Sequence, residues 1–216
     1  MNLRRIHGML AFAMIVFAGC ATIVPVPQLD QPESSGFGIV VTLRAPVGIF
    51  SATPDLVYFA KIDNEDGLLQ QQIIPSNYNK WNRFYLLNVR PGTYVAVGAF
   101  FRRISPGVRS TIYTTYFSKD LVDQTRVNVA ASDFTFMGSC VVDQSVGLGG
   151  ADPVQIHYSS VIAPGAIKAG LLHYLSGDFH YRGTALEVKN DEKTRSEFLR
   201  SAKEDLAEGG WTTRFK

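Results

Sequence analysis

The stretch FYLLNVRPGTYVAVGAF (residues 84–100) places two runs of β-forming residues on either side of a turn. Pro91 presets its own φ to a value that suits a turn, and Gly92 permits a positive φ. In the second run the side chains alternate between the two faces of a strand, so that Tyr94 and its alternate neighbours share one face. The stretch therefore predicts a β-hairpin with one face that can be buried.

Short β-rich segments separated by turn residues surround this hairpin. Eight segments are predicted to be strands, over residues 36–45, 55–63, 68–75, 83–89, 93–101, 110–117, 125–130 and 133–143. Glu65, Asp66 and Gly67 form a tight-turn signal between the second and the third. Their spacing, roughly 10–20 residues, favours an antiparallel sandwich or barrel over βαβ units. We expect a mainly β fold, namely an antiparallel β-sandwich over residues 36–146 with a C-terminal α-helical appendage.

The arrangement of strand, Pro91-Gly92-Thr93-Tyr94 and strand resembles a hairpin of transthyretin-like and carboxypeptidase-regulatory-like β-sandwich domains. In those families the motif is structural, and the tyrosine packs near a corner. The resemblance covers about 17 residues. It implies a sandwich fold of the kind that serves as a non-catalytic accessory or surface module.

The N-terminus has the pattern of a secretory signal. Arg4 and Arg5 precede ten apolar residues, Met9 to Ala18, without a charge. At about 1.5 Å per residue a helix of that length spans only about half of the ~30 Å hydrocarbon core. Residues 1–19 are therefore predicted to be a signal peptide. An uncleaved anchor helix from Met9 to about Ile23 is the alternative.

The residues Phe17-Ala18-Gly19-Cys20 at the end of this run resemble the lipobox of bacterial lipoproteins. The resemblance implies that the Cys20 thiol receives a diacylglycerol and that the preceding peptide bond is then cut. Leu is usual where Phe17 stands. Some lipoproteins carry an Asp after the cysteine as an inner-membrane retention signal, and Ala21 stands there instead. We therefore expect lipidation of Cys20 and anchoring in the cell envelope at the outer membrane.

Residues 20–35 are predicted to be a lipidated tether, because they contain three prolines and show no apolar periodicity. Lys and Arg total 21, and Asp and Glu total 19. Since Arg4 and Arg5 would leave with the signal peptide, the mature chain is balanced in charge. This balance gives no electrostatic argument for a nucleic-acid partner. Cys140, in the apolar context FTFMGSCVVD, is predicted to be a buried structural thiol.

Residues 147–216 differ in character from the preceding strands. The glycine-rich link at 147–155 lacks the lysine and serine or threonine of a phosphate loop. The aromatic segment 154–183 is predicted to contain a short helix at 167–175, and 184–189 a strand. Residues 190–210 are the clearest helix. Its apolar face is formed by Phe198, Leu199, Ala202 and Leu206, and Trp211 is expected to fold back on that face. We expect this helix to dock on the sandwich.

Three groups of side chains could carry a function, although none has a distinctive spacing. Histidines in the aromatic segment could bind a metal or serve a hydrolase: His157, His173 and His180, with Asp178 nearby. Arginines could meet anionic lipid or polysaccharide: Arg102, Arg103 and Arg109. Aromatic side chains could stack on a sugar: Tyr78, Trp81, Tyr113, Tyr116 and Phe117. Each group is also explained by ordinary packing or a solvated loop.

The leading hypothesis is a lipid-anchored envelope protein that acts as a non-catalytic binding or envelope-organising module. Its expected partners are the membrane, through the lipid, and another envelope protein or a polysaccharide. No catalytic, cofactor-binding or metal-ligating residue and no cofactor is predicted. The alternative is an envelope hydrolase or metal-dependent enzyme with its site in residues 154–183.

Overall fold

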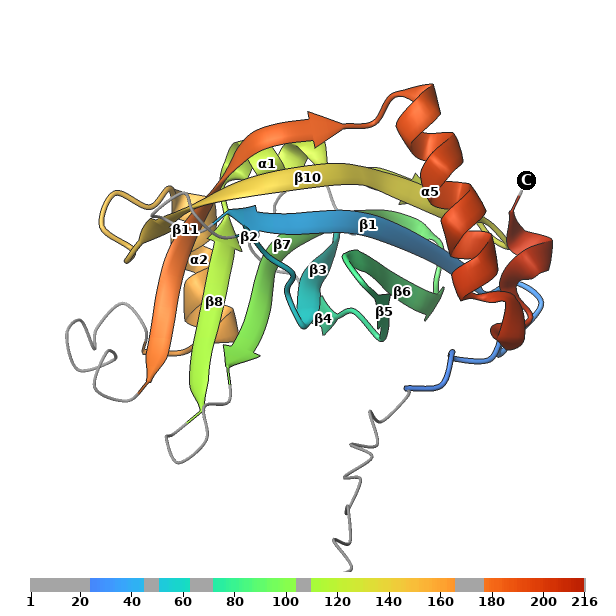
Figure 1. The fold of residues 1–216 in the computed structure, drawn as a ribbon, viewed down its shortest axis with the longest axis horizontal. Helices are drawn as coiled ribbons and strands as arrows, with labels where there is room; N and C mark the ends of the chain where they lie inside the picture. Colours follow the sequence, from blue (N-terminus) through green and yellow to red (C-terminus); the bar gives the residue numbers. More distant parts are fainter. Residues whose placement is uncertain (1–23, 45–50, 63–71, 104–109, 166–176, 216) are drawn as a thin grey trace, which may run out of the picture.

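The computed structural model of the chain describes residues 24–44, 51–62, 72–103, 110–165 and 177–215 (Figure 1). The fold is mainly β, with 49% strand and 23% helix, which confirms the expected class. The strands are β1 (Ser35–Arg44), β2 (Ser51–Ala52), β3 (Leu56–Ile62), β4 (Ile73–Pro75), β5 (Tyr78–Lys80), β6 (Arg83–Val89), β7 (Gly92–Arg103), β8 (Thr111–Phe117), β9 (Val127–Val129), β10 (Phe134–Val146) and β11 (Asp178–Lys189). The helices are α1 (Lys119–Gln124), α2 (Pro153–Ile162) and α5 (Glu192–Asp205), followed by the 3-10 turns η1 (Ala207–Gly209) and η2 (Trp211–Arg214).

The strands form one curled, mixed sheet rather than the expected antiparallel sandwich. Its order is β4-β3-β7-β8-β11-β10-β1-β6-β5, with β2 beside β1 and β9 beside β7. Two neighbouring pairs are parallel, β1 with β10 and β11 with β8. Local sequence patterns reveal a strand but not its partner, and these parallel pairs join segments far apart in the chain. The shape is a half-barrel, not two stacked layers.

Strand β11 lies in the middle of the sheet, between β10 and β8. The predicted strand at 184–189 is the second half of β11. The sheet therefore does not end at residue 146, and the expected division into a sandwich (36–146) and a packed appendage (147–216) is wrong. The later part of the chain supplies a central strand of the same sheet.

Residues 73–80 connect the two ends of the strand order. Within this short segment, β4 pairs with β3 and β5 pairs with β6. Between the two strands, the Ser76 amide donates to the Val57 carbonyl at 2.8 Å, and the Asn77 amide donates to the Tyr85 carbonyl at 3.1 Å. The curled sheet is thus drawn together at this point, which encloses the larger of two cores.

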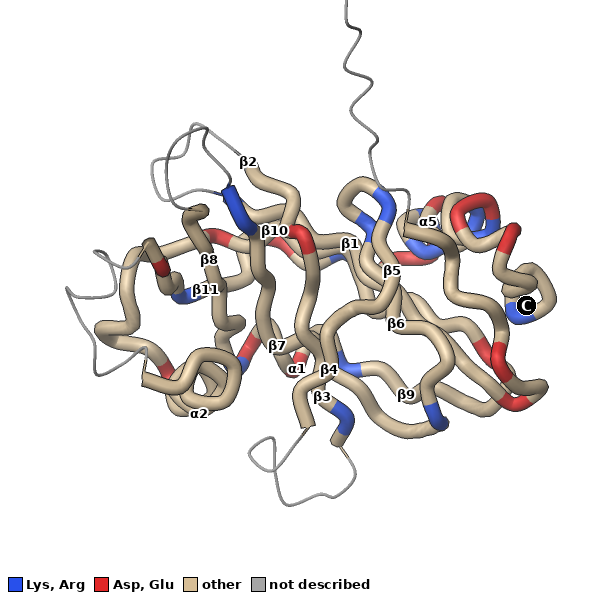
Figure 2. The backbone as a smooth tube through the Cα atoms, turned by 90° about the horizontal axis from the view of Figure 1, so that it is seen from below, with Lys and Arg blue, Asp and Glu red and all other residues tan. Residues whose placement is uncertain are grey.

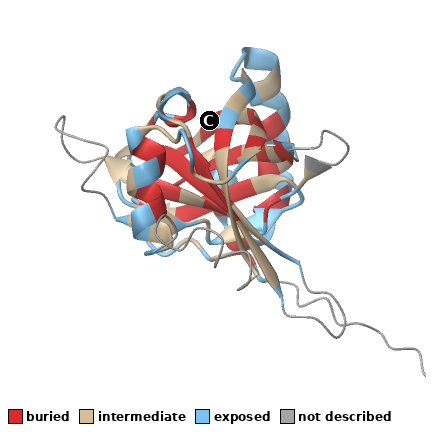
Figure 3. Ribbon diagram, turned by 90° about the vertical axis from the view of Figure 1, so that its left-hand side faces the viewer, coloured by how far each residue is buried: buried red, intermediate tan, exposed pale blue. Residues whose placement is uncertain are grey.

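Strand β1 separates the two cores because its side chains alternate in direction. Phe37, Ile39, Val41 and Leu43 pack into the larger core. The other face carries Gly36 and Gly38, and a β-carbon on Gly38 would lie only 2.5 Å from the Phe198 ring of α5. These glycines allow α5 to pack closely on the sheet. Figure 3 shows the buried residues gathered in the sheet and on the inner sides of the helices.

Helix α5 and the turns after it cover this second core. The C-terminal helix was predicted to dock through its apolar face in this way. Phe198, Ala202, Leu206 and Trp211 are buried there, and Leu199 is partly buried beside them. The N-cap is Asp191, and its side chain accepts a hydrogen bond from the Thr194 amide at 3.0 Å. None of the helices in the described residues is both long and apolar enough to cross a membrane.

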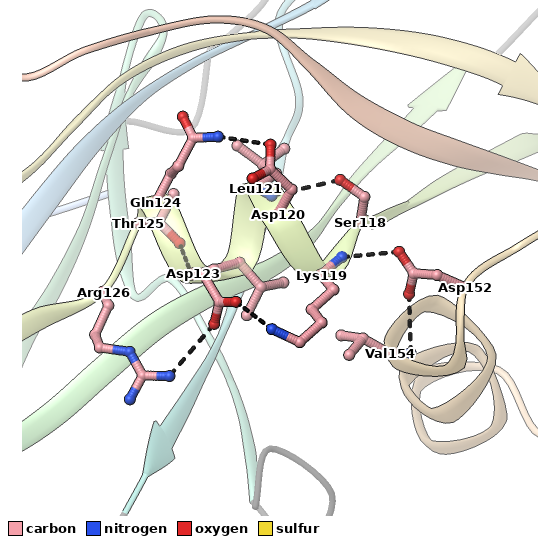
Figure 4. A network of polar contacts seen from close by, with 11 residues as sticks. Ser118, Lys119, Asp120, Leu121, Asp123, Gln124, Thr125, Arg126, Asp152 and Val154 are labelled. Carbon is pink, nitrogen blue, oxygen red and sulfur yellow. Dashed lines mark hydrogen bonds and ion pairs between the residues drawn. The ribbon is translucent and has the colours of Figure 1, made fainter.

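Helices α1 and α2 were missed by the sequence patterns, and one carboxylate joins them (Figure 4). Asp152 caps α2 by accepting from the Val154 and Gln155 amides, both at 2.9 Å. Its other oxygen accepts from the Lys119 amide at the start of α1, at 2.8 Å. The Gln155 side chain accepts in turn from the Asp152 amide, which completes a capping box. The Asp152-Pro153-Val154-Gln155 spacing is the signal that could have revealed α2.

The predicted turn between β6 and β7 is present, and it yields a direct test. Gly92 has φ +153°, and a β-carbon there would lie 2.5 Å from Lys61 Cε. The Tyr94 hydroxyl donates to the Arg90 carbonyl at 2.7 Å, which closes the corner. Gly92→Val should therefore lower the free energy of unfolding by about 1–3 kcal/mol, as measured by urea denaturation.

Gly149→Val is the matched control, because nothing lies within 4 Å of a β-carbon built there. We expect the control to stay within about 0.5 kcal/mol of the wild type. An equal loss in the two variants would show that the effect does not come from the corner.

Candidate functional site at the N-terminal surface

The described part of the segment before β1, from residue 24 onward, is docked on the fold, although residues 20–35 were expected to be a lipidated tether. Val26 is buried in the core under α5. The Trp211 indole donates from Nε1 to the Pro27 carbonyl at 2.8 Å, and the Leu29 amide donates to the Gly209 carbonyl at 3.0 Å. Residues from Val26 onward are thus held through their backbone, which explains why the segment needs no apolar periodicity.

Asn88 holds the same segment from the β6 side. Its Nδ2 donates to the Gln28 carbonyl at 2.7 Å, and its Oδ1 accepts from the Asp30 amide at 3.1 Å. Asn88 has φ 60°, a conformation that asparagine tolerates better than most residues. The segment is therefore fixed between β6 and the C-terminal turns.

A buried carboxylate next to this segment ties the β5–β6 hairpin to α5. Asp205 Oδ2 accepts from Arg83 Nε at 2.6 Å and from the Tyr85 hydroxyl at 2.7 Å. Lys80 Nζ lies 3.2 Å from Asp205 Oδ1. Burial would raise the pKa of Asp205, but the hydrogen bonds from Arg83 and Tyr85 outweigh it and lower the pKa below its ordinary value. Asp205 is therefore a charged cross-link inside the fold.

Trp81 lies at the tip of the hairpin that Asp205 holds. Its side chain is 78% exposed, the largest exposure among the large apolar residues that the structure describes. Its φ is 58°, and a bulky residue in that region costs about 1–3 kcal/mol. The Asn82 carbonyl accepts from the Val41 amide at 3.0 Å, which fixes the turn on β1. The hairpin thus holds the Trp81 indole exposed to solvent, and the positive φ of Trp81 lowers the stability of the fold.

We call this region the N-terminal surface. It comprises residues 24–29, the hairpin tip at 80–83 and the turn at 208–211. Figures 1 and 2, which are related by a 90° rotation, both show the β5–β6 hairpin beside the start of the described chain. The same small core contains Val26, Tyr78 and Trp211, so one packing unit supports the whole surface. Cys20 itself lies outside the described residues.

The candidate histidines lie elsewhere, near α2 and β11. His157 is on α2 and His180 on β11, whereas His173 lies outside the described residues. The Tyr116 hydroxyl is 2.8 Å from His180 Nδ1, and burial raises the pKa of Tyr116. Among the described residues no group of three or more His, Cys, Asp or Glu could hold a metal ion. Asp178 begins β11 two positions before His180, so both lie on one face of that strand.

The structure divides the proposed sugar-stacking residues between two places. Tyr116 and Phe117 are fully buried and cannot present a stacking face. Tyr113 stacks on Phe101, with ring centres 4.3 Å apart and an interplanar angle of 2°. Tyr78 and Trp81 belong to the N-terminal surface. The five aromatic residues therefore do not form one binding face.

The remaining candidate residues that the structure describes have contacts within the fold. The Arg102 amide donates to Asp55 Oδ2 at 2.6 Å, and the Arg102 guanidinium lies 5.9 Å from the centre of the Phe100 ring. Arg109 lies outside the described residues, as does the predicted turn at Glu65, Asp66 and Gly67. Cys140 is buried, and burial raises its pKa to about 12. The predicted burial of this thiol is confirmed.

Comparison of the chain with the profiles of known protein families, with characterised proteins and with solved structures gave no match. The N-terminal surface therefore rests on the geometry of this chain alone. Sequence reasoning missed the two features that define it, the docked segment and the strained turn. One signal for Asp205 was available, because an acidic residue stands between Ala202 and Leu206 on the apolar side of the helix.

Proposed function

We propose that this protein is held on a cell-envelope membrane by a lipid on Cys20, and that its folded domain is a non-catalytic binding or envelope-organising module. The outer membrane is the proposed location. The observation that carries the proposal is the short distance between the lipobox-like cysteine and the folded core. Val26 is buried, and it follows Cys20 by only six positions. A fully extended chain of six residues spans at most about 20–22 Å.

The Pro91-Gly92-Thr93-Tyr94 corner is present, with the Tyr94 hydroxyl donating to the Arg90 carbonyl at 2.7 Å, but the sheet around it is a mixed half-barrel and not the sandwich that the resemblance implied. A lipid on Cys20 would hold the domain close to the bilayer, with the N-terminal surface nearest to it. A partner in the envelope, a protein or a polysaccharide, would then meet the surfaces that face away. The alternative proposal is an envelope hydrolase or metal-dependent enzyme with its site in residues 154–183.

Lipidation can be tested by labelling cells that express the protein with radioactive palmitate. We expect the wild type to incorporate label and Cys20→Ser to incorporate none, because the serine hydroxyl does not replace the thiol in the lipid transfer. Cys140→Ser is the matched control and should label like the wild type, since its thiol is buried. Equal labelling of the wild type and Cys20→Ser, or labelling of neither, would contradict the proposal.

A further inference from the structure

Trp81 combines three properties that seldom occur together. Its indole is 78% exposed, its φ of 58° is unfavourable for a bulky side chain, and the hairpin that carries it is fixed by a buried ion pair. Strained residues are maintained where the surrounding structure determines them, and they are frequent at sites of interaction. The exposed indole is therefore a candidate contact site, and its position decides what it contacts.

The position of Trp81 follows from the packing at the N-terminal surface. Tyr78, three residues before Trp81, packs in the same core as Val26. Val26 in turn follows Cys20 by six residues, at most about 20–22 Å of extended chain. A lipid on Cys20 would therefore keep the hairpin tip beside the membrane surface. No segment of the described chain covers the indole there.

We propose that Trp81 is a second membrane contact, whose indole enters the boundary between lipid headgroups and acyl chains and orients the domain on the bilayer. This inference rests on the lipid anchor proposed above. Tryptophan is enriched at that boundary because its ring is apolar while its N–H remains hydrated. Lys80, beside it in the turn, is 47% exposed and can approach the phosphates even though it also pairs with Asp205.

A single lipid chain anchors a protein only marginally, and stable anchoring generally needs a second signal. A triacylated cysteine would already hold the protein on the bilayer, so we assign to Trp81 a role in orientation. A lipid on Cys20 alone does not specify which face of the domain is turned toward the bilayer, whereas an inserted side chain on a rigid hairpin does. The surface around α2, which Figures 1 and 2 show well separated from the β5–β6 hairpin, would then face away.

The two tryptophans of the chain make the test direct, because Trp211 is fully buried and Trp81 is exposed. The full lipidated protein is reconstituted in phosphatidylcholine and phosphatidylglycerol vesicles that carry brominated acyl chains, which quench only tryptophan that lies in the bilayer. We expect quenching of the wild-type emission and its loss in Trp81→Phe, where only Trp211 emits. The remaining Trp211 emission, unchanged in wavelength, reports that the variant is folded.

A relocated tryptophan provides the control for orientation. Ile156 on α2 is 45% exposed, so Ile156→Trp in the Trp81→Phe background places an indole at the other end of the fold. We expect this protein to be unquenched. Equal quenching of the relocated tryptophan, or no loss of quenching in Trp81→Phe, would overturn the inference.

Palmitate labelling of the same preparations tests the lipid anchor on Cys20 independently of the Trp81 contact. Labelled protein without quenching at Trp81 would overturn the Trp81 contact and leave the lipid anchor in place. Unlabelled protein with quenching would overturn the lipid anchor and support the contact.

Discussion

Trp211→Ala should lower the free energy of unfolding by about 3–5 kcal/mol, as expected when a large buried aromatic is removed. Trp211 is fully buried in the core that joins α5, β1 and the N-terminal segment. The substitution leaves a cavity and also removes the donor to the Pro27 carbonyl, a hydrogen bond of 2.8 Å. Urea denaturation followed by circular dichroism measures the loss.

The same variant should release the N-terminal segment. The Leu29 amide and the Gly209 carbonyl are bonded at 3.0 Å immediately beside the indole. We expect limited proteolysis to cut between residues 24 and 34 faster than in the wild type. Trp81→Ala is the matched control, since its side chain is 78% exposed, and it should change stability by no more than about 0.5 kcal/mol. A similar loss in both variants would contradict the role of Trp211 as a buried support.

Asp205→Ala should lower the free energy of unfolding by about 3 kcal/mol. Removing one partner of a buried ion pair leaves the charge of the other partner buried and unpaired. The Asp205 side chain is 3% exposed and that of Arg83 20%, so the guanidinium keeps partial access to water. The Tyr85 hydroxyl would also lose its acceptor. Asp123→Asn is the matched control: its partners lie on the surface, and surface pairs contribute about 0–1 kcal/mol.

The depressed pKa of Asp205 adds a pH dependence with a definite sign. The folded protein holds this pKa below its ordinary value, whereas the unfolded chain titrates near about 3.9. The stabilisation is therefore complete above about pH 4 and is lost as the pH falls through the folded pKa. Asp205→Asn should show a shallower decline of stability below pH 4 than the wild type. Parallel declines in both proteins would show that other carboxylates cause the acid effect.

Local patterns predicted most strands and the C-terminal helix, because both depend on side chains close in sequence. The limits of β6 were predicted residue by residue, and the apolar face of α5 led correctly to Trp211 as its cover. The parallel pairing of β1 with β10 was not predictable, since nothing in either segment specifies its partner. Likewise, nothing local places β11 between β8 and β10.

The candidate site was less predictable than the fold. Trp81 could be recognised as an aromatic residue, but its exposure follows from a turn geometry that residues 80–83 do not specify by themselves. The N-terminal segment carries prolines and polar residues, which indicate a linker. Its docking depends on the backbone carbonyl groups of Pro27 and Gly209. Every residue of any sequence has such a group. Backbone recognition of this kind leaves no trace in amino-acid composition.

The docking of the N-terminal segment on the C-terminal turns also determines when the molecule can finish folding. Pro27 and Trp211 are 184 positions apart, and Ser35 bonds to the Ala130 carbonyl, 95 positions later. Closing such distant contacts is slow, because chain entropy is lost before the contacts repay it. During synthesis one edge of β1 can pair with β6 as soon as residues 83–89 have been made, whereas its other edge waits for β10, residues 134–146. The core around Trp211 cannot close before the last residues of the chain have been made, so the N-terminal segment stays undocked during the period in which the export proposed for this protein would begin.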